Sequence, residues 1–252
     1  MNPEELISCS LDIGEQMLIS GAEIGRVEDS VTLICKAYGC RRVDVFTITS
    51  SIVVSIESSN GVHMTQTRRI TAGGTDLTRL DRLNNLSRQL CRETPSYAYA
   101  QQRIQEICAK KRFPLWVEAL SSALIAFSFA IFFGGSLADG LAALPLGFLI
   151  RYLTYILEKA SLNQVFVNVI ASFVLSVAAA GLVSIGIGQD ANKLIIGGIM
   201  LLIPGIALTN SLRDMISGDI MSGLLRFFNA VLVAAAIAAG YILAAGLVGG
   251  AL

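Results

Sequence analysis

The sequence has few charged residues, a single histidine and no closely spaced cysteine pair. Charged residues occupy 15% of 252 positions and hydrophobic residues 54%, whereas an average soluble domain carries roughly 25% charge. This deficit excludes a disordered chain and argues against an ordinary soluble enzyme. Lys plus Arg and Asp plus Glu both total 19, so no basic excess points to a nucleic-acid partner.

The sequence also lacks the residue patterns that usually bind metal ions or supply a catalytic nucleophile. The five cysteines form no C-x-x-C spacing, and only His63 could assist them. We therefore expect five reduced, mostly buried thiols, no metal site, no disulfide framework and no cofactor. The sequence contains no Walker loop, no G-x-S-x-G and no H-E-x-x-H, which argues against an enzyme. Glu4 and Glu5 interrupt the N-terminus, which does not read as a cleavable signal peptide.

The charge that is present lies mostly in the first part of the chain. Residues 1–114 hold 14 Lys/Arg and 13 Asp/Glu, whereas residues 115–252 hold 5 and 6. The first part has the charge density of a soluble domain. The second consists of long apolar runs with short polar breaks, the pattern of a multi-span membrane protein. The sequence therefore predicts two domains, 1–114 and 115–252.

The first part reads as a small α+β domain. Apolar periodicity predicts helices over about 6–20 and 27–39, and β-branched runs predict strands at 43–48, 51–57 and 62–68. Asn60-Gly61 is a strong turn signal between the last two strands. Thr75 can cap a helix reaching about Cys91, and Pro95 opens a final helix that ends in the basic run 110–112.

The second part predicts a five-helix, all-α membrane domain. The candidate spans lie at about 115–135, 138–157, 165–188, 194–210 and 224–248, each near the ~20 residues that a bilayer requires. The fourth is short, and Pro204-Gly205 predicts that it is bent or broken. The last span carries alanine at four-residue spacing. Such small-residue stripes serve either packing within the chain or a subunit interface.

Basic residues near the span ends predict the orientation. Seven fall on one side, and only Lys193 falls on the other; the seven are Lys110, Lys111, Arg112, Arg151, Lys159, Arg213 and Arg226. By the positive-inside rule the first domain is cytoplasmic, and the C-terminus lies outside. In this arrangement Arg151, within the second span, extends its side chain to the cytoplasmic interface.

The polar segment after the fourth span is the candidate site. Charge at membrane depth costs at least ~2.5–3.5 kcal/mol per residue, so its four charged residues need partners or a wet cavity. One reading is a solvated cytoplasmic loop over 211–223; the other is a polar vestibule on the transport path, next to a broken helix. The candidate residues are Asn210, Ser211, Arg213, Asp214, Asp219 and Arg226, with the helix break at Pro204 and Gly205.

Chemistry suggests roles within that segment. Arg213 or Arg226 could bind a substrate carboxylate through its planar guanidinium. Asp214 or Asp219 could carry a coupling proton if burial raised its pKa. If the segment is helical, Asn210 and Asp214 share one face. Asn168, near the start of the third span, is a further candidate.

A second segment, residues 21–29, combines two glycines with Glu23, Arg26, Glu28 and Asp29. Early acidic residues suit a helix N-terminus. The other reading is a docking or gating surface of the cytoplasmic domain.

The two segments together carry a family resemblance. Ser20-Gly21-Ala22 with Arg26-Val27-Glu28, and 209–226 with its Thr-Asn-Ser, Arg-Asp, Gly-Asp and Ser-Gly steps, resemble the two signatures of the threonine/serine exporters (ThrE type). The resemblance covers essentially the whole chain, and the length resembles the short, split form (YjjP type).

The resemblance implies an inner-membrane, multi-pass subunit of a gradient-driven secondary exporter. Its implied substrates are small carboxylate-bearing metabolites, either threonine and serine or succinate. Its implied partner is a second small membrane subunit, and a homo-oligomer in the lipid bilayer is the other assembly we expect. The alternative function is a non-transporting assembly or regulatory subunit whose cytoplasmic domain gates a partner.

Overall fold

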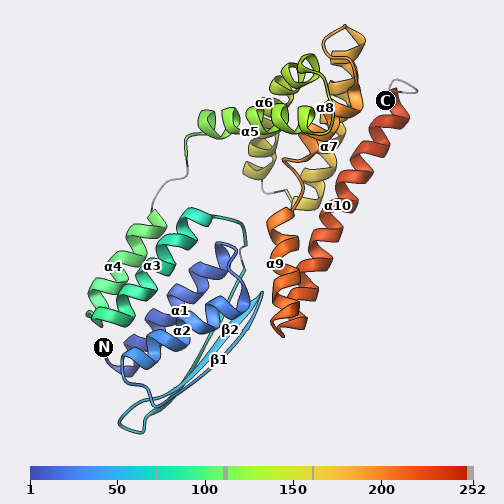
Figure 1. Cartoon of the computed structure of the whole chain (residues 1–252). Helices are drawn as coiled ribbons and strands as arrows, with labels where there is room; N and C mark the ends of the chain where they lie inside the picture. The colour runs from blue at the N-terminus through green and yellow to red at the C-terminus, as the bar shows by residue number, and fades with distance from the viewer. Residues whose placement is uncertain (72, 110–112, 161, 249–252) are drawn as a thin grey trace. The chain divides into compact units, whose positions relative to one another are not determined.

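The computed structural model describes residues 1–71, 73–109, 113–160 and 162–248, which form two compact units (Figure 1). Unit 1 comprises Met1–Lys111 and Ile206–Phe228, and unit 2 comprises Arg112–Gly205 and Asn229–Leu252. Unit 1 thus takes in a polar segment that lies well beyond residue 114, where the composition changes. The two units are described separately.

Two helices begin unit 1, as the periodicity predicts. α1 (Pro3–Ile19) starts with a capping box, in which the side chain of Asn2 accepts the N–H of Glu5 and Glu5 accepts the N–H of Asn2. α2 (Ile24–Ala37) has Glu23 at its N-cap, but Glu23 makes no side-chain capping hydrogen bond. The start of α2 therefore needs an acceptor from elsewhere in the chain.

The three predicted strands are confirmed to within one residue. β1 (Arg42–Ile48), β2 (Ser51–Glu57) and β3 (His63–Arg69) form an antiparallel sheet in the order β1-β2-β3. Gly61 makes the turn between β2 and β3 with a φ of +76°, a conformation that suits glycine. Alternate residues of β2 are buried, namely Ile52, Val54 and Ile56, so one face of the sheet packs on the core.

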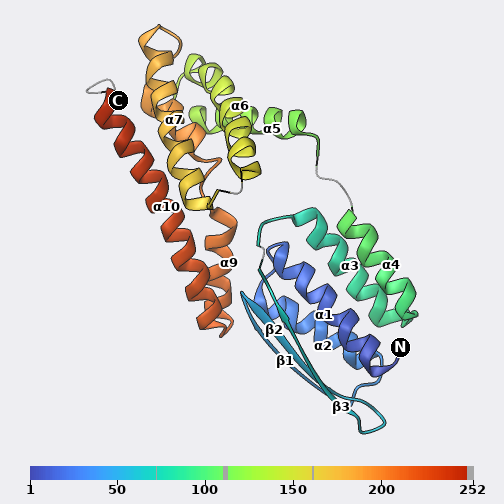
Figure 2. The same cartoon turned by 180° about the vertical axis from the view of Figure 1, so that it is seen from behind.

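Two helices complete the N-terminal α+β fold. α3 (Leu77–Glu93) is capped by Asp76, whose carboxylate accepts the N–H of Arg79, and not by Thr75 as predicted. α4 (Tyr97–Ala109) follows, and the predicted basic end at 110–112 lies outside the described residues. α1 and α2 contact the sheet, and α3 and α4 pack on α1 from the other side (Figure 2). The core between these layers is aliphatic, with Leu11 and Leu83 fully buried.

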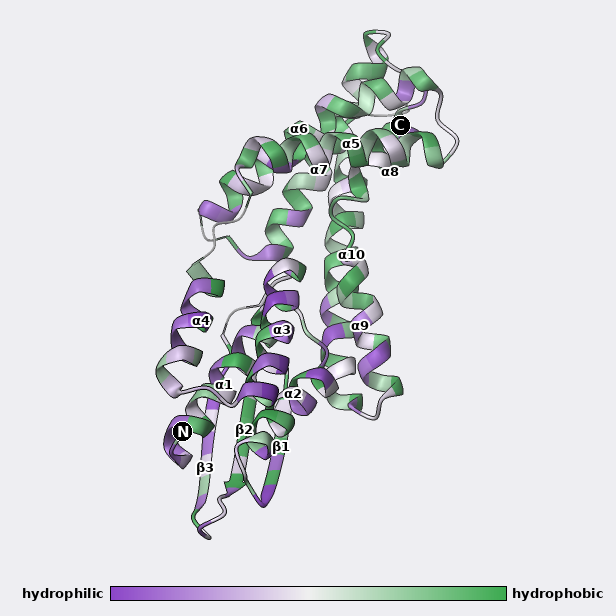
Figure 3. Cartoon of the chain, turned by 60° about the vertical axis from the view of Figure 1, so that its left-hand side comes forward, coloured by the Kyte–Doolittle hydropathy of each residue, from purple (hydrophilic) through white to green (hydrophobic). Residues whose placement is uncertain are grey.

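Unit 2 is helical throughout its described residues. It contains α5 (Leu115–Phe132), α6 (Leu137–Lys159), α7 (Gln164–Ser184), α8 (Ala191–Ile199) and the greater part of α10 (Ile220–Val248). In the described residues, four helices are long and apolar enough to cross a membrane: α5, α6, α7 and α10. Hydrophobic residues dominate these helices, whereas the helices of unit 1 alternate between polar and apolar positions (Figure 3).

The segment at 194–210 is not one continuous span. α8 ends at Ile199, and α9 (Gly205–Ile216) begins after the break. α8 has nine residues, about 14 Å at 1.5 Å per residue, which is too short for a ~30 Å hydrocarbon core. Pro204 has no N–H to donate and disfavours helical geometry in the residue before it. The break predicted at Pro204-Gly205 is therefore confirmed, and the predicted fourth span over 194–210 is two separate helices.

Small residues let the helices of unit 2 approach closely. A Cβ on Gly147 would lie 2.5 Å from the Cα of Ala123, and one on Gly197 would lie 2.5 Å from the carbonyl oxygen of Ala126. A Cβ on Gly240 of α10 would lie 2.3 Å from the carbonyl oxygen of Val169 on α7. Packing of backbone against backbone holds helices together where the surrounding lipid removes the hydrophobic drive.

A buried carboxylate fixes one end of unit 2. Asp139, 2% exposed, accepts the N–H groups of Ser136 at 2.8 Å, Gln189 at 2.5 Å and Asp190 at 3.1 Å. The α5–α6 turn and the α7–α8 turn are thereby joined at the same end of the unit.

Candidate functional site

The polar segment folds into a helical hairpin. α9 and the start of α10 are joined at residues 217–219, where Gly218 has a φ of +103°. Gly223 allows the two helices to touch, because a Cβ there would lie 2.7 Å from the carbonyl oxygen of Ser211 and 2.4 Å from Met215 Cγ. The segment is therefore not an irregular loop over 211–223. We call residues 205–228 the polar hairpin.

The partner of the polar hairpin within unit 1 is the connection between α1 and α2, residues 20–23. Gly21 has a φ of +90°, and a Cβ at this position would lie 2.9 Å from the carbonyl oxygen of Gly74. Both the conformation and the space therefore require glycine. This tight turn leaves the carbonyl groups of Gly21 and Ala22 free to accept hydrogen bonds from outside the turn.

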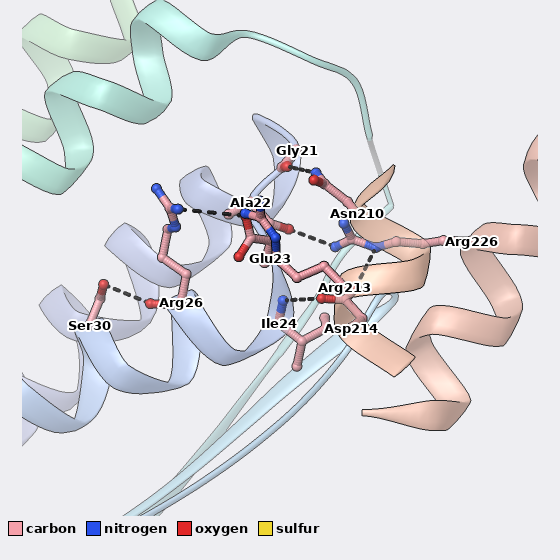
Figure 4. A network of polar contacts seen from close by, with 10 residues as sticks. All are labelled: Gly21, Ala22, Glu23, Ile24, Arg26, Ser30, Asn210, Arg213, Asp214 and Arg226. Carbon is pink, nitrogen blue, oxygen red and sulfur yellow. Dashed lines mark hydrogen bonds and ion pairs between the residues drawn. The ribbon is translucent and has the colours of Figure 1, made fainter. Parts of the chain in front are cut away.

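Three side chains of the hairpin bind this connection (Figure 4). Asn210 Nδ2 donates to the Gly21 carbonyl at 3.0 Å, and Arg226 Nη2 donates to the Ala22 carbonyl at 2.7 Å. Arg213 forms an ion pair with Glu23. The two segments that resemble family signatures, almost 190 residues apart in sequence, are therefore in direct contact.

The fourth side chain, Asp214, supplies the missing cap of α2. Its Oδ1 accepts the backbone N–H of Ile24 at 3.1 Å. Its Oδ2 lies 3.4 Å from Arg226 Nε, at ion-pair distance, but without hydrogen-bond geometry to any described residue. Asp214 is 1% exposed. A carboxylate at a helix N-terminus is stabilised both by free N–H groups and by the helix dipole.

Burial dominates the electrostatics of Asp214. Removal from water raises the pKa of its carboxyl above the ordinary value, while Arg226 and the Ile24 N–H act in the opposite direction. The charges of Asp219 and Glu23 raise the pKa further. Burial also raises the pKa of Glu28 on α2, although its carboxylate accepts the N–H of Thr47 at 2.7 Å. The contact region therefore holds carboxyl groups that take up protons more readily than isolated ones.

A cleft of about 570 Å³ opens beside these contacts in unit 1. Arg26 and Arg88 offer cationic groups to it, and Glu23 and Asp29 offer carboxylates. The remaining lining includes Ser30, Asn84, Ser87, Asp214 and Ser217. A groove with charges of both signs suits a small zwitterionic or carboxylate-bearing molecule.

The predicted site residues have different environments. Asn210, Arg213, Asp214 and Arg226 come together as described, and Asp219 lies at the hairpin turn, near the first turn of α2. Ser211 is fully buried and donates to the carbonyl of Leu208 in its own helix. Asn168 belongs to unit 2, where it is buried and accepts a hydrogen bond from Gln164. Pro204 and Gly205 mark the start of α9.

Two contacts were not predicted from the sequence. The backbone carbonyls of Gly21 and Ala22 carry no sequence signal as acceptors, although the composition of 21–29 marks that segment as unusual. The ion pair of Arg151 with Glu118 inside unit 2 was also not predicted, and the position of Arg151 at the membrane interface stays a prediction. Among the described residues, no group of three or more His, Cys, Asp or Glu is arranged to hold a metal ion.

Comparison with known proteins identifies the family of this chain. The family model ThrE, described as "Putative threonine/serine exporter", matches residues 8–248. The chain belongs to the threonine/serine exporter family. Its membership, together with four helices apolar enough to cross a membrane, makes it a multi-pass membrane protein of a transporter family.

Three curated relatives are similar to this exporter-family chain. A "Probable threonine/serine exporter" of Mycobacterium tuberculosis is 25% identical over 96% of this chain and 46% of the relative. The "Threonine/serine exporter" of Corynebacterium glutamicum is 26% identical over 90% of this chain and 48% of the relative. The chain thus spans about half the length of these two. A "Probable succinate transporter subunit YjjP" of Klebsiella aerogenes is 23% identical over 94% of this chain and 90% of the relative. No solved structure matches the chain.

Proposed function

We propose that this chain is one subunit of an inner-membrane exporter that moves small carboxylate-bearing metabolites out of the cytoplasm along an ion gradient. The observation that carries the proposal is the contact between the polar hairpin and residues 20–23, because it joins both family-like segments. α10 begins at Ile220 in unit 1, which also includes Arg226, and continues to Val248 as a candidate span. α10 therefore contributes residues to both units.

In this proposal the chain crosses the membrane five times, with the fourth crossing broken. The N-terminal fold is cytoplasmic and the C-terminus is outside. α8 supplies one part of the fourth crossing, and residues 200–204 interrupt it before α9. Irregular backbone at membrane depth is tolerated where it lines a cavity or is buried in protein, and broken helices recur at transport sites.

The name of one relative supports a second subunit. The relative that this chain covers over 90% of its length is named a transporter subunit. We infer that this chain also works together with a second membrane protein. If both subunits line the transport path, the helices of this chain do not have to enclose the path alone.

The arrangement of the charges favours a mechanical role for the polar hairpin. Arg213, Asp214 and Arg226 are engaged by Glu23, Ile24 and Ala22, so most of the charge of the hairpin is committed to contacts within unit 1. We propose that these contacts couple the N-terminal α+β fold to α10 and that protonation of Asp214, a buried carboxylate, weakens its ion pair with Arg226. The second candidate function, a regulatory subunit that gates a partner, uses the same contacts without transport by this chain.

Efflux measurements test the proposal. Cells lacking endogenous export and expressing this chain with its partner should release preloaded labelled succinate or labelled threonine faster than cells expressing the partner alone. Asp214→Ala should slow efflux strongly, whereas Arg213→Gln, which removes a half-exposed ion pair, should slow it less. If neither compound leaves faster in cells whose membranes contain both proteins, export of these substrates is excluded. If a membrane-inserted Asp214→Ala protein exports as well as the wild type, the hairpin has no coupling role.

A further inference from the structure

An ion pair lies between two candidate membrane helices of unit 2. Glu118 precedes the end of α5 by 14 residues, and Arg151 follows the start of α6 by 14 residues. Because a short turn joins these antiparallel helices, the two residues lie at the same depth, about 21 Å from that turn. Their side chains are 25% and 19% exposed. Glu118 lies in the first turn of α5, so the pair lies toward the end of the two helices opposite the turn that joins them. A partly buried charge pair between candidate membrane helices is a candidate functional site.

The geometry of the pair does not use the full hydrogen-bonding capacity of the Arg151 guanidinium. Arg151 Nε donates to Glu118 Oε2 at 2.9 Å, and Nη2 donates to the same oxygen. Within the described part of the chain, the hydrogen bond of Nη1 is a long one, to Thr154 Oγ1 at 3.4 Å. In a forked arrangement, two guanidinium nitrogens would each bind a different carboxylate oxygen. A carboxylate that approached Arg151 in that orientation would bind through both of its oxygens, whereas Glu118 uses one.

A cavity leads to this pair. It has a volume of about 460 Å³ and is lined by Phe113, Leu115, Glu118, Arg151, Tyr155, Glu158 and Lys159. This volume falls within the roughly 300–1,000 Å³ of small-molecule sites. Arg151, Tyr155 and Lys159 lie four residues apart along α6, so they share one face and form a polar stripe from the helix end to the pair. A pair that only joined two helices would require no such route.

The aromatic ring of Tyr155 supports the cation from the side. The guanidinium carbon of Arg151 lies 6.0 Å from the centre of this ring, at the limit of a cation–π interaction. The ring therefore holds the guanidinium in place when its carboxylate partner changes. In the described residues of α5, α6, α7 and α8, the basic residues are Arg151, Lys159 and Lys193. Lys159 and Lys193 lie at or near helix ends, whereas Arg151 lies inside α6.

We propose that Arg151 binds the carboxylate of a small metabolite that enters through this cavity and displaces Glu118. The ligand class, a small carboxylate, rests on the proposed function, whereas the location rests on the pair, the cavity and the stripe. Glu118 occupies Arg151 when no ligand is bound and so competes with it. For an amino acid, the released Glu118 can accept the ligand's ammonium group.

Thermal stability of the purified chain in detergent tests binding independently of transport. Succinate and threonine should each raise Tm in a concentration-dependent manner, because a ligand that binds only the folded state stabilises it. Succinamide, which has no carboxylate, should not. Glu118→Gln should shift the half-maximal response to several-fold lower succinate concentration, because the competitor is removed. Lys193→Gln, the matched loss of a cation elsewhere in unit 2, should respond as the wild type does.

The double variant Glu118→Gln/Arg151→Gln keeps the result interpretable. Removing both charges leaves no unpaired ion, so the helices should still pack. We expect this protein to fold and to lose the response to succinate. A folded double variant that responds like the wild type would overturn the site, as would a wild-type protein that no carboxylate stabilises. If the chain binds carboxylates through Arg151 but exports none, only the proposed function fails; if the double variant exports normally, only this inference fails.

Discussion

The carboxylate of Asp214 caps helix α2 by accepting the backbone N–H of Ile24 at 3.1 Å, from a position 190 residues further along the chain. Helix caps usually come from the residue immediately before the helix. Here the local candidate, Glu23, is turned to Arg213 instead. The start of α2 is therefore complete only when the polar hairpin is docked on it.

The pH dependence of stability should reveal the buried state of Asp214. Because its pKa is raised in the folded protein, the folded state binds more protons than the unfolded state in the window above the ordinary aspartate pKa of about 4. The contribution of Asp214 to the free energy of unfolding is thus present below that pKa and is lost as the pH rises through the folded-state value. Asp214→Asn, which still accepts the Ile24 N–H, does not titrate.

The measurement is Tm against pH for the wild type and Asp214→Asn. We expect the Tm of the asparagine variant to rise relative to the Tm of the wild type as the pH increases above about 4. Asp214→Ala, which removes the cap, should be less stable than Asp214→Asn at every pH by about 1 kcal/mol. If the Tm of the wild type instead rose relative to that of Asp214→Asn with increasing pH, the raised pKa would be contradicted.

Gly240 should be far less tolerant of substitution than Gly246 in the same helix. Gly240→Ala would place a Cβ 2.3 Å from the Val169 carbonyl oxygen, whereas a Cβ on Gly246 meets nothing within 4 Å. The first change must separate α7 from α10 and strain the hydrogen bond from Ser172 to the Ile237 carbonyl. We expect a loss of about 1–3 kcal/mol, typical of overpacking. Comparing detergent thermal stability of the two alanine variants checks this, and equal stability would argue against the close α7–α10 approach.

The buried thiols should be unreactive in the folded protein. Burial raises the pKa of Cys9 and of Cys35 to about 12. At pH 8 the reactive thiolate form is then roughly one ten-thousandth of each thiol. Both side chains are also fully buried from solvent. Mass spectrometry after maleimide treatment should find these two unmodified in native protein and modified after denaturation. Rapid native labelling of either residue would show that the core of unit 1 opens readily.

Labelling of intact cells should distinguish the two ends of unit 2. Asp139 joins the α5–α6 and α7–α8 turns at one end, and the proposed orientation puts this end outside. An Ile187→Cys variant should therefore react with a membrane-impermeant maleimide, whereas Leu162→Cys at the other end should not. Both positions are exposed. The native cysteines all lie in the cytoplasmic part of the proposed topology, so the unsubstituted protein serves as the control. The reverse labelling pattern would invert the orientation.

Local signals predicted most elements of the fold. Alternating β-branched residues and Asn60-Gly61 predict the strands, and period-3.6 patterns predict α1 and α2, because each depends on neighbours in sequence. The cap of α3 was assigned one residue early, since Thr75 and Asp76 are both good caps. Pro204 indicated a break, but not that the following residues would form a second helix belonging to unit 1.

The candidate site was predicted in its residues but not in its contacts. The charges of 210–226 are conspicuous because they follow apolar runs. Their partners are backbone groups of residues 21, 22 and 24, and a backbone carbonyl or N–H is present at every position and so gives no signal. The pairing of Glu118 with Arg151 was likewise invisible, because it depends on α5 and α6 lying antiparallel with their charges level.

The sequence by itself determined that this chain has a charged α+β part and an apolar helical part, because composition and periodicity are local properties of the chain. It also determined which few polar residues near the membrane part need partners. Only the tertiary structure decided what those partners are. Asp214 and Arg226 meet residues 22–24, and Glu118 meets Arg151, because burial of a charge is tolerated only where the fold brings a compensating group within a few ångströms.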